Sequence, residues 1–509
     1  MHAIPPGSTV AVIGSGAMGA GIAQVAATAG HQVLLFDTRP DAADKAILEI
    51  GKTYAKLVEK GRMGAVESDL ARERLKRIAS LQEAAGAVLV IEAIVENLDA
   101  KRALFAELEG VVGRNCILAT NTSSISVTAI GAQLQHPERL VGMHFFNPVP
   151  LMALVEVISG LATSRDVANV VHAVAESWGK SPVHAKSTPG FIVNRVARPY
   201  YAEALRLLLE QAADVATLDA VMRDCGGFRM GPFELMDLIG HDVNFSVTNS
   251  VFSAYYNDPR FTPSILQQEL VSAGFLGRKT GRGFYRYGDD VPKLAPQTEA
   301  AGSKPSAVRY AGARGAVDAV AGRLRGAGLE SVAIEAAPGL YCEGAAIYLT
   351  DGRSATERAE ADGHRDTILF DLLLDPAGAT RIALARADQC GDAAWQAAVG
   401  LFQAAGFAVT RLDDVPGMAV MRTVAMLANE AADAVNQGVC SARAVDIAMQ
   451  KGVNYPRGPL AWADTIGLRQ VVAVLANLAA TYGEDRYRVS PLLRRKLAAD
   501  PQGARFHAQ

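Results

Sequence analysis

The chain has 509 residues, which is too long for one ordinary domain and predicts about three or four. Half of the residues are hydrophobic and 20% are charged, a balance that excludes a disordered chain. Lys and Arg total 50 against 53 Asp and Glu, a net charge of −3, so neither a nucleic-acid partner nor a basic membrane surface is indicated. We expect a protein that acts on small molecules.

Cysteine usage and the amino-terminal sequence both favour a cytoplasmic location. The chain has five Cys, an odd number without any C-x-x-C pair, which predicts neither a disulfide framework nor a metal site. The first residues, MHAIPPGSTVAVIG, lack the basic and uninterrupted apolar segments of a signal peptide. No apolar stretch is long enough to predict a membrane span.

A dinucleotide-binding motif begins at the first predicted strand, residues 9–13. The strand is followed by Gly14-Ser15-Gly16-Ala17-Met18-Gly19 and then by an apolar-periodic helix, which is the setting that G-x-G-x-x-G requires. The first glycine permits the tight turn, the second lets a pyrophosphate approach the backbone, and the third lets helix and strand pack closely. Free N–H groups at the start of the helix would receive the phosphate charge.

A second predicted strand, residues 32–36, ends at Asp37, where an acidic residue can hold the ribose hydroxyls of the cofactor. A carboxylate there repels a 2′-phosphate, so NAD is favoured over NADP. Arg39 could instead accept that phosphate. Asp37 could also be a solvated acid at the end of a strand.

Residues 41–79 read as charged helical sequence rather than as a third strand. Lys52, Lys56 and Lys60 recur at every fourth position and therefore share one helix face. This face could meet the phosphates of a bulky anionic substrate, or it could simply be solvated.

Two further predicted strands, residues 87–91 and 116–119, are followed by polar residues that include Glu96 and Ser123. The carboxyl ends of strands line the ligand crevice in doubly wound sheets. We therefore expect these side chains in the crevice, although Ser123 could instead serve as the N-cap of the following helix.

His144 ends a predicted strand, and Glu156 follows twelve residues later inside an apolar strand. Histidine is the natural general base near neutral pH, and a buried carboxylate needs a partner. We predict that the two side chains pair, because a carboxylate fixes the imidazole tautomer and stabilises the imidazolium. Such a pair could remove a hydroxyl proton while a hydride passes to nicotinamide.

The sequence resembles the L-3-hydroxyacyl-CoA dehydrogenase family through several motifs in family order. They are VIGSGAMGAGIA (12–23), IEAIVENLDAK (91–101), TNTSS (120–124), HFFNP (144–148), LVEVI (154–158) and TPGFIVNR (188–195).

This resemblance implies NAD-dependent oxidation of a (3S)-3-hydroxyacyl-CoA to the 3-ketoacyl-CoA. His144 then matches the catalytic base and Glu156 its orienting partner, while Ser123 and Asn194 match residues that bind the reacting part of the substrate. Positions that match the family's cofactor site include Asp37, Glu96, Lys101, Ser123 and Asn147, beside Gly14, Gly16, Ala17, Met18 and Gly19 of the glycine motif. The lysine-bearing segment corresponds to a helical hairpin that contacts coenzyme A in the family, which favours Lys60 and Lys56 as CoA contacts.

Residues 187–287 are predicted to be helical, and a second copy of this segment appears when the chain is shifted by 227 residues. Pro189-Gly190 falls on Pro416-Gly417, and the register continues without a gap through Gly240 and Gly467, which indicates a duplication. Asn194 becomes Met421 in the second copy, so one active site is predicted. Because small members of the family pair through this domain between subunits, the second copy could supply that partner within one chain; it could also be a spacer.

The predicted fold class is α/β plus all-α, with a Rossmann doubly wound sheet first. The expected division is a NAD-binding domain (1–186), a helical domain (187–288), a linker (289–306), a degenerate Rossmann-like domain (307–413) and a second helical copy (414–509). The degenerate domain lacks both the glycine motif and a His–Glu pair, so we expect no cofactor there. Whether the chain forms a homo-oligomer stays open.

The long form resembles the phenylacetate-catabolic 3-hydroxyadipyl-CoA dehydrogenases, so the dicarboxylic substrate is favoured over 3-hydroxybutyryl-CoA. No particular arginine is assigned to the distal carboxylate; Arg198 and Arg229 are two possibilities. A β-hydroxyacid dehydrogenase would use a lysine where this chain offers His144. A non-catalytic, crystallin-like protein that keeps NAD is a remote alternative.

Overall fold

The structure is a computed structural model that describes residues 3–312 and 316–507. The chain divides into two compact units. The first unit comprises residues 1–195 and 437–454, and the second comprises residues 196–436 and 455–509.

Short apolar runs in the first unit form an eight-stranded sheet in the order β3-β2-β1-β4-β5-β6-β7-β8. All neighbouring strands are parallel except β6 and β7, which are antiparallel. The first six strands have the order of a doubly wound nucleotide-binding sheet. The strands are β1 (Thr9–Ile13), β2 (Gln32–Phe36), β3 (Leu75–Arg77), β4 (Leu89–Glu92), β5 (Ile117–Thr120), β6 (Leu140–Phe145), β7 (Leu154–Ser159) and β8 (Ser181–Lys186).

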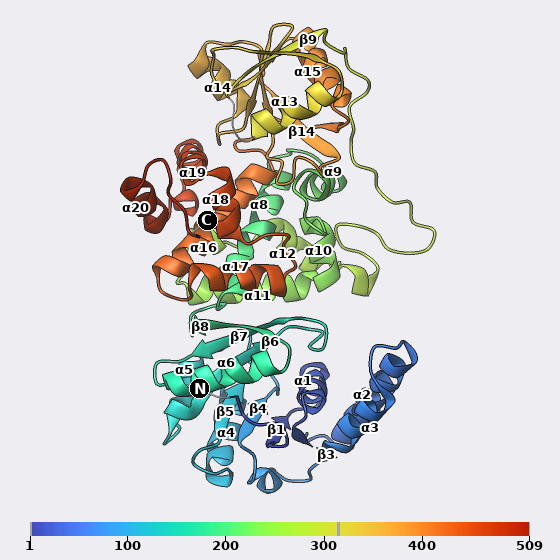
Figure 1. Ribbon diagram of the computed structural model, residues 1–509, viewed down its shortest axis with the longest axis vertical. Helices are drawn as coiled ribbons and strands as arrows, with labels where there is room; N and C mark the ends of the chain where they lie inside the picture. Colours follow the sequence, from blue (N-terminus) through green and yellow to red (C-terminus); the bar gives the residue numbers. More distant parts are fainter. Residues whose placement is uncertain (1–2, 313–315, 508–509) are drawn as a thin grey trace. The chain divides into compact units, whose positions relative to one another are not determined.

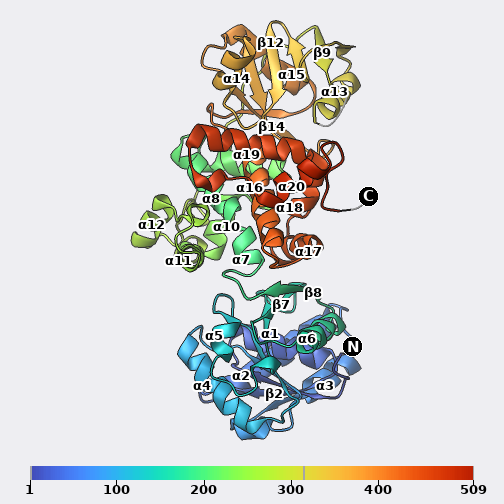
Figure 2. The same cartoon turned by 90° about the vertical axis from the view of Figure 1, so that its left-hand side faces the viewer.

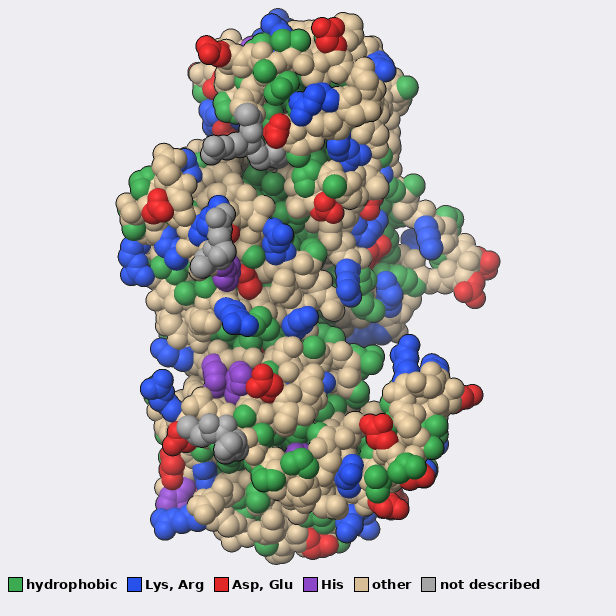
Figure 3. Space-filling model, in the orientation of Figure 1, with side chains coloured by type: hydrophobic (Ala, Val, Ile, Leu, Met, Phe, Trp, Pro, Cys, Tyr) green, Lys and Arg blue, Asp and Glu red, His purple; other side chains and the backbone are tan. Residues whose placement is uncertain are grey.

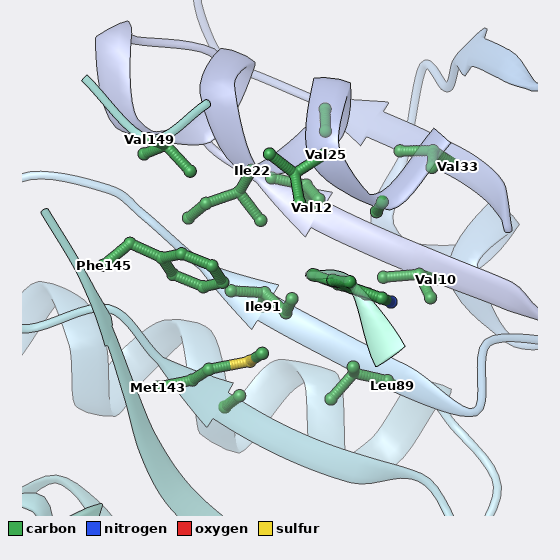
Figure 4. Packing of buried hydrophobic residues seen from close by; sticks show 14 of the residues in the cluster. Val10, Val12, Ile22, Val25, Val33, Leu89, Ile91, Met143, Phe145 and Val149 are labelled. Atoms are coloured by element: carbon green, nitrogen blue, oxygen red, sulfur yellow. The ribbon is translucent and has the colours of Figure 1, made fainter. Parts of the chain in front are cut away.

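Helices cover this sheet and enclose its core. Side chains of α1, such as Ile22 and Val25, lie against Val12, Ile91 and Phe145 of the strands (Figure 4). The helix α6 packs on β6, β7 and β8 (Figure 1). The helices of the unit are α1 (Ala17–Thr28), α2 (Ala42–Glu59), α3 (Ala65–Glu73), α4 (Leu98–Val111), α5 (Val127–Gly131), α6 (Arg165–Ser177), α7 (Val193–Val196) and α17 (Ala442–Gly452), with short 3₁₀ turns at Leu81–Ala84 and Pro137–Arg139.

The second unit contains two groups of helices that pack together through α8 and α16 (Figure 2). The first group is α8 (Arg198–Leu209), α9 (Val215–Ala220), a π-helical turn (Val221–Cys225), α10 (Pro232–Ile239), α11 (His241–Ala254) and α12 (Ile265–Ser272), with 3₁₀ turns at Pro259–Phe261 and Arg278–Thr280. The second group is α16 (Val420–Asn436), α18 (Pro459–Ile466), α19 (Leu468–Tyr482) and α20 (Pro491–Ala499), with a 3₁₀ turn at Asp485–Tyr487.

A seven-stranded mixed sheet in the order β10-β9-β11-β12-β13-β14-β15 completes the second unit. Its elements are β9 (Ala307–Ala311), α13 (Ala316–Gly326), β10 (Glu330–Ala333), β11 (Gly339–Cys342), β12 (Ala345–Leu349), α14 (Ala355–Asp362), β13 (Thr367–Phe370), β14 (Arg381–Arg386), α15 (Asp392–Ala404) and β15 (Ala408–Arg411). The predicted fold class, a Rossmann sheet with helical domains and a second, degenerate sheet, is therefore confirmed.

The duplication extends further toward the amino terminus than the sequence comparison indicated. The ranges of β14 and α15 equal those of β7 and α6 shifted by 227 residues, and the range of α18 equals that of α10 with the same shift. The helix α16 ends at Asn436, as α8 ends at Leu209. The second half therefore repeats the later strands of the first sheet as well as its helical domain.

Two strands of the first sheet were missed in the sequence. The segment 41–79, expected to be helical throughout, contains β3, which pairs with β2. The strand β8 pairs with β7 although its His184 and Lys186 are exposed. Both strands have too few apolar residues for a clear strand pattern.

Charged side chains of both signs are interspersed on the face shown in Figure 3, in keeping with the small net charge. Within the described residues, no helix is both long enough and apolar enough to span a membrane.

Candidate active site

The glycine loop follows β1 and leads into α1. Gly14 has a φ of +103°, and a Cβ there would lie 2.5 Å from the carbonyl oxygen of Ala93. A Cβ on Gly19 would lie 1.8 Å from the carbonyl oxygen of Gly14. At Gly16, by contrast, a Cβ would meet no atom within 4 Å, so the protein's own packing does not require glycine there.

Space for a ligand therefore exists where the motif predicts it. Gly16 is the N-cap of α1 and provides no capping side chain, so N–H groups of the first turn, which includes Ala17 and Met18, are open to an anion. A cavity of about 820 Å³ is lined by Gly14, Gly16 and Asp37 together with residues that follow β4 and residues of α4. Its size and the open helix terminus fit a dinucleotide.

Asp37 is held by both neighbouring segments. The backbone N–H and hydroxyl of Ser15 donate to Oδ2 at 2.9 and 2.7 Å, and the Arg39 guanidinium donates to both carboxylate oxygens at 3.0 Å. The Arg39 guanidinium, helped by the N–H and O–H donors, holds the pKa of the Asp37 carboxyl well below its usual range. Only 8% of the side chain is exposed, so Asp37 is not the solvated acid that the sequence left as an alternative.

An ion-pair network joins the end of β4 to α4 and was only partly foreseen. Lys101 Nζ lies 2.6 Å from Glu92 and 3.3 Å from Glu96. Glu92 also accepts from the Ile94 N–H at 2.8 Å and the Thr120 hydroxyl at 2.7 Å. The sequence contained a signal for Glu92, since a carboxylate at the end of an apolar strand requires a partner.

Glu96 organises the loop after β5. Its Oε1 accepts from the Thr122 hydroxyl at 2.7 Å and from the backbone N–H groups of Ser123 and Ser124 at 2.9 and 3.1 Å. Burial acts to raise the pKa of Glu96, but these hydrogen bonds and the charge of Lys101 outweigh it and lower the pKa. Glu96 is therefore an ionised acceptor that fixes the backbone of Ser123.

Ser123 does not cap a helix. The N-cap of α5 is Ser126, whose hydroxyl accepts from the N–H of Ala129. The Ser123 hydroxyl lies 3.4 Å from Glu96, and its carbonyl oxygen accepts from the Asn194 amide at 3.4 Å. The structure thus brings two of the predicted catalytic residues together.

His144 and Glu156 pair across the antiparallel strands β6 and β7, where they lie directly opposite each other. His144 Nδ1 is 2.7 Å from Glu156 Oε2. Phe146 and Phe191 lie against the ring, with centroids 4.5 and 5.9 Å from it. Among the described residues, none hydrogen-bonds to Nε2, which is therefore the nitrogen available to a substrate.

The second oxygen of Glu156 makes a contact that the sequence did not predict. Oε1 accepts from the N–H groups of Ile192 and Val193 at 2.9 and 3.1 Å. These residues immediately precede Asn194. A single buried carboxylate therefore links the histidine to the segment that presents Asn194.

Other predicted residues stay outside these contacts. Asn147 is exposed, and no hydrogen bond ties its side chain to a described residue. Lys56 is exposed on α2 and Lys60 forms the C-cap of that helix, neither in contact with the residues above. Asn121 was overlooked: its Oδ1 accepts from the Phe145 N–H at 2.8 Å and connects the ends of β5 and β6.

No cluster of possible metal ligands occurs in residues 3–312 and 316–507.

The second half replaces the pair with a different arrangement. Asp371 stands 227 residues after His144, and Ala383 stands at the same distance after Glu156. Asp371 accepts from the N–H groups of Ala419 and Val420 at 2.9 and 2.7 Å, the positions that correspond to Ile192 and Val193. The carboxylate that joins sheet and helix is kept, but the base is absent.

Comparison with known families matches successive parts of the chain. Residues 9–188 match "3-hydroxyacyl-CoA dehydrogenase, NAD binding domain", and residues 190–287 and 417–506 match the C-terminal domain of the same family. Residues 347–416 match "3-hydroxybutyryl-CoA dehydrogenase reduced Rossmann-fold domain".

Individual relatives cover either the whole chain or its first half. A 3-hydroxyadipyl-CoA dehydrogenase of Escherichia coli (strain K12) is 44% identical over 96% of this chain and 97% of its own length. A probable 3-hydroxybutyryl-CoA dehydrogenase of Bacillus subtilis (strain 168) is 42% identical over 55% of this chain and 96% of its own length. The crystal structure of a 3-hydroxybutyryl-CoA dehydrogenase from E. coli K12 has a TM-score of 0.89 and 42% identity, and the match covers 98% of this chain and 99% of that one.

Proposed function

The chain belongs to the 3-hydroxyacyl-CoA dehydrogenase family, and on that premise we propose that it oxidises (3S)-3-hydroxyadipyl-CoA to 3-oxoadipyl-CoA in phenylacetate catabolism. It is an NAD-dependent oxidoreductase of 3-hydroxyacyl-CoA thioesters. The observation that supports the adipyl substrate is the similarity to the E. coli 3-hydroxyadipyl-CoA dehydrogenase, which extends over 96% of this chain.

His144 is the general base in this proposal. Its Nε2 takes the proton of the C3 hydroxyl, while Nδ1–H donates to Glu156. The carboxylate fixes the tautomer that leaves Nε2 unprotonated and then stabilises the imidazolium. Bound NAD would accept the hydride that leaves C3.

Ser123 and Asn194 hold the C3 oxygen and the thioester region against His144. Their adjacency supports this role, because the Asn194 amide lies 3.4 Å from the Ser123 carbonyl oxygen. Two fixed polar groups orient the reacting carbon without moving during the reaction.

Replacing His144 by Gln should lower kcat by about 10²–10⁴.

In this proposal the glycine loop would hold NAD, and the N–H groups at the start of α1 would bind its pyrophosphate. Asp37 would bind the ribose hydroxyls, and the remaining contacts would come from Gly14, Gly16, Ala17, Met18, Gly19, Glu96, Lys101, Ser123 and Asn147. Lys56 and Lys60 contact the coenzyme A part of the substrate. Both are exposed and carry no ion pair to a described residue, which leaves their charge free for phosphate.

We further propose that the protein works in the cytoplasm and binds neither nucleic acid nor a membrane. We also propose that its domains are a NAD-binding domain (1–186), a helical domain (187–288), a linker (289–306), a degenerate Rossmann-like domain (307–413) and a second helical copy (414–509). The packing of α8 on α16 within one unit supports pairing of the two helical copies inside a single chain. A homo-oligomer that adds contacts between chains stays compatible with that pairing.

A second candidate substrate is 3-hydroxybutyryl-CoA, because the similar E. coli crystal structure is that of a 3-hydroxybutyryl-CoA dehydrogenase. The test is NADH formation from the butyryl and adipyl forms of the 3-hydroxyacyl-CoA. A higher kcat/KM for the adipyl form supports the proposal, and a higher value for the butyryl form replaces it. Binding of NAD without turnover of either thioester would leave the crystallin-like alternative.

A further inference from the structure

A small cavity in the helical part of the second unit is lined by arginines. It has a volume of about 150 Å³ and lies among α8, α11 and the segment from Arg260 to Gln267. Exposed Leu209 and Ile265 line it on the solvent side. The arginines that line it are Arg198, Arg206, Arg260 and Arg486.

Three of the four arginines have carboxylate partners. Arg206 pairs with Glu484 at 3.0 Å. Arg260 pairs with Glu430 at 3.2 Å and with Asp433. Arg486 lies 3.7 Å from Glu484 and 4.0 Å from Glu203.

Arg198 is the exception. Its Nη1 donates to the Thr248 hydroxyl at 3.1 Å, and its guanidinium carbon lies 4.8 Å from the centre of the Tyr201 ring. No carboxylate among the described residues pairs with it, although only 5% of the residue is exposed. A buried charge without a counter-ion is costly, and burial lowers the pKa of Arg198.

Residues that line this cavity also carry buried donors without a partner. The Nε atoms of Arg198, Arg260 and Arg486 and the Ser264 hydroxyl have no hydrogen-bond partner among the described residues. Buried polar groups in proteins nearly always have a partner. Four residues around one cavity therefore carry unsatisfied donors, which favours a ligand that accepts hydrogen bonds.

We propose that this cavity binds a small carboxylate, with Arg198 as its counter-charge and the Ser264 hydroxyl as a further donor. One unpaired cation matches the single charge of a carboxylate better than the double charge of a phosphate, and a guanidinium can bind a carboxylate through two parallel bonds. The cavity has room for several water-sized groups but is far smaller than a pocket for coenzyme A.

Two sources could supply that carboxylate. One is the distal carboxylate of a dicarboxylyl-CoA substrate, an assignment that rests on the proposed function. The other is a free carboxylate such as succinate, bound independently of the reaction. Both sources share the same recognition chemistry.

The first experiment compares adipyl and butyryl substrates in Arg198→Met, Arg198→Lys and the control Arg495→Met, which removes an exposed arginine of α20. If the substrate supplies the carboxylate, Arg198→Met should lower kcat/KM for the adipyl form by about 10–10²-fold, because a hydrogen bond to a charged group contributes roughly 1.5–3 kcal/mol. The butyryl value should stay within about threefold of wild type, and Arg198→Lys should retain part of the selectivity.

The second experiment measures the Tm of the full-length protein with sodium succinate, sodium phosphate or sodium chloride at equal ionic strength. If a free carboxylate binds, succinate alone raises the Tm, and Arg198→Met and Ser264→Ala reduce that rise. The wild-type measurement and Ser264→Ala remain informative if Arg198→Met does not fold.

The proposal is overturned if Arg198→Met leaves adipyl selectivity unchanged and succinate does not raise the Tm, since water would then satisfy the donors. It is also overturned if phosphate stabilises the protein more than succinate does. Failure of the proposed function gives a different result, namely no turnover of either thioester while succinate still raises the Tm through Arg198.

Discussion

Glu156 Oε2 lies 2.7 Å from His144 Nδ1, while Oε1 of the same carboxylate accepts hydrogen bonds from the N–H groups of Ile192 and Val193. Glu156 therefore has two separable tasks: it orients the imidazole, and it holds the segment before Asn194. Glu156→Gln should preserve the second task through its amide oxygen but present an N–H donor to Nδ1. We expect kcat to fall by about 10²–10⁴, since the wrong histidine tautomer is then favoured.

Steady-state NADH formation checks this expectation, with Glu176→Gln as the control because Glu176 is exposed on α6. The Tm of Glu156→Gln should stay close to that of wild type. A near-normal kcat would show that the carboxylate charge is not needed to orient His144.

The cofactor preference should depend on Asp37. In the present arrangement the Arg39 guanidinium is engaged by the Asp37 carboxylate. Asp37→Ser removes the repulsion of a 2′-phosphate and frees Arg39 to bind it. We expect the ratio of kcat/KM for NADP to that for NAD to rise by about 10–10²-fold, as expected for a new hydrogen bond between charged groups.

The double variant Asp37→Ser/Arg39→Met serves as the control for Arg39. The double variant should lose most of the increase in kcat/KM for NADP, while its kcat/KM for NAD should stay as low as that of Asp37→Ser. If the single and double variants use NADP equally well, Arg39 does not bind the phosphate.

Asp371 should make stability depend on pH. Burial raises its pKa to about 6, although four backbone N–H groups act to lower it. Between its ordinary pKa of 3.8 and about 6, the carboxyl ionises in the unfolded chain before it ionises in the folded one. The unfolded state therefore binds fewer protons, and this group's contribution to stability falls as the pH rises through 6.

Relative to Asp371→Asn, wild type should lose about 1 kcal/mol between pH 5 and 7, because one pKa unit corresponds to about 1.4 kcal/mol. The Tm of both proteins across this range measures the difference. Asp388→Asn, at an exposed position, should show no such trend. A constant gap between wild type and Asp371→Asn would mean that Asp371 is already ionised at pH 5.

The two helical copies are joined by a buried arginine. Arg422 is fully buried and pairs with Glu203 at 2.7 Å and with Glu210 at 2.8 Å. Arg422→Met should destabilise the protein by about 3–5 kcal/mol because it leaves Glu203 without its closest cation. The double variant Arg422→Met/Glu203→Gln should recover part of that loss, which thermal unfolding would detect; no recovery would contradict the role of the unpaired charge.

Local sequence patterns were sufficient for the strands that begin the fold. The predicted ranges 9–13 and 32–36 agree with β1 and β2, because both are apolar runs bounded by turn residues. The predicted strand at 87–91 is shifted, since β4 continues to Glu92, whose charge is neutralised by Lys101. The charge of Glu92 signals that a partner is needed, but a strand pattern alone does not identify Lys101 as that partner.

The sequence by itself determined the family, the glycine loop, the pairing of His144 with Glu156 and the duplicated half, because each depends on residue types at set spacings. Only the tertiary structure decided that Glu156 also holds the backbone before Asn194 and that Asp371 keeps this task in the second half. It also decided that Arg198 is buried with no carboxylate partner in the part of the chain that the structure describes. These facts depend on which backbone N–H groups and charges meet after folding. Residue type alone does not specify such partners, since any buried donor can be satisfied by an acceptor from elsewhere in the chain.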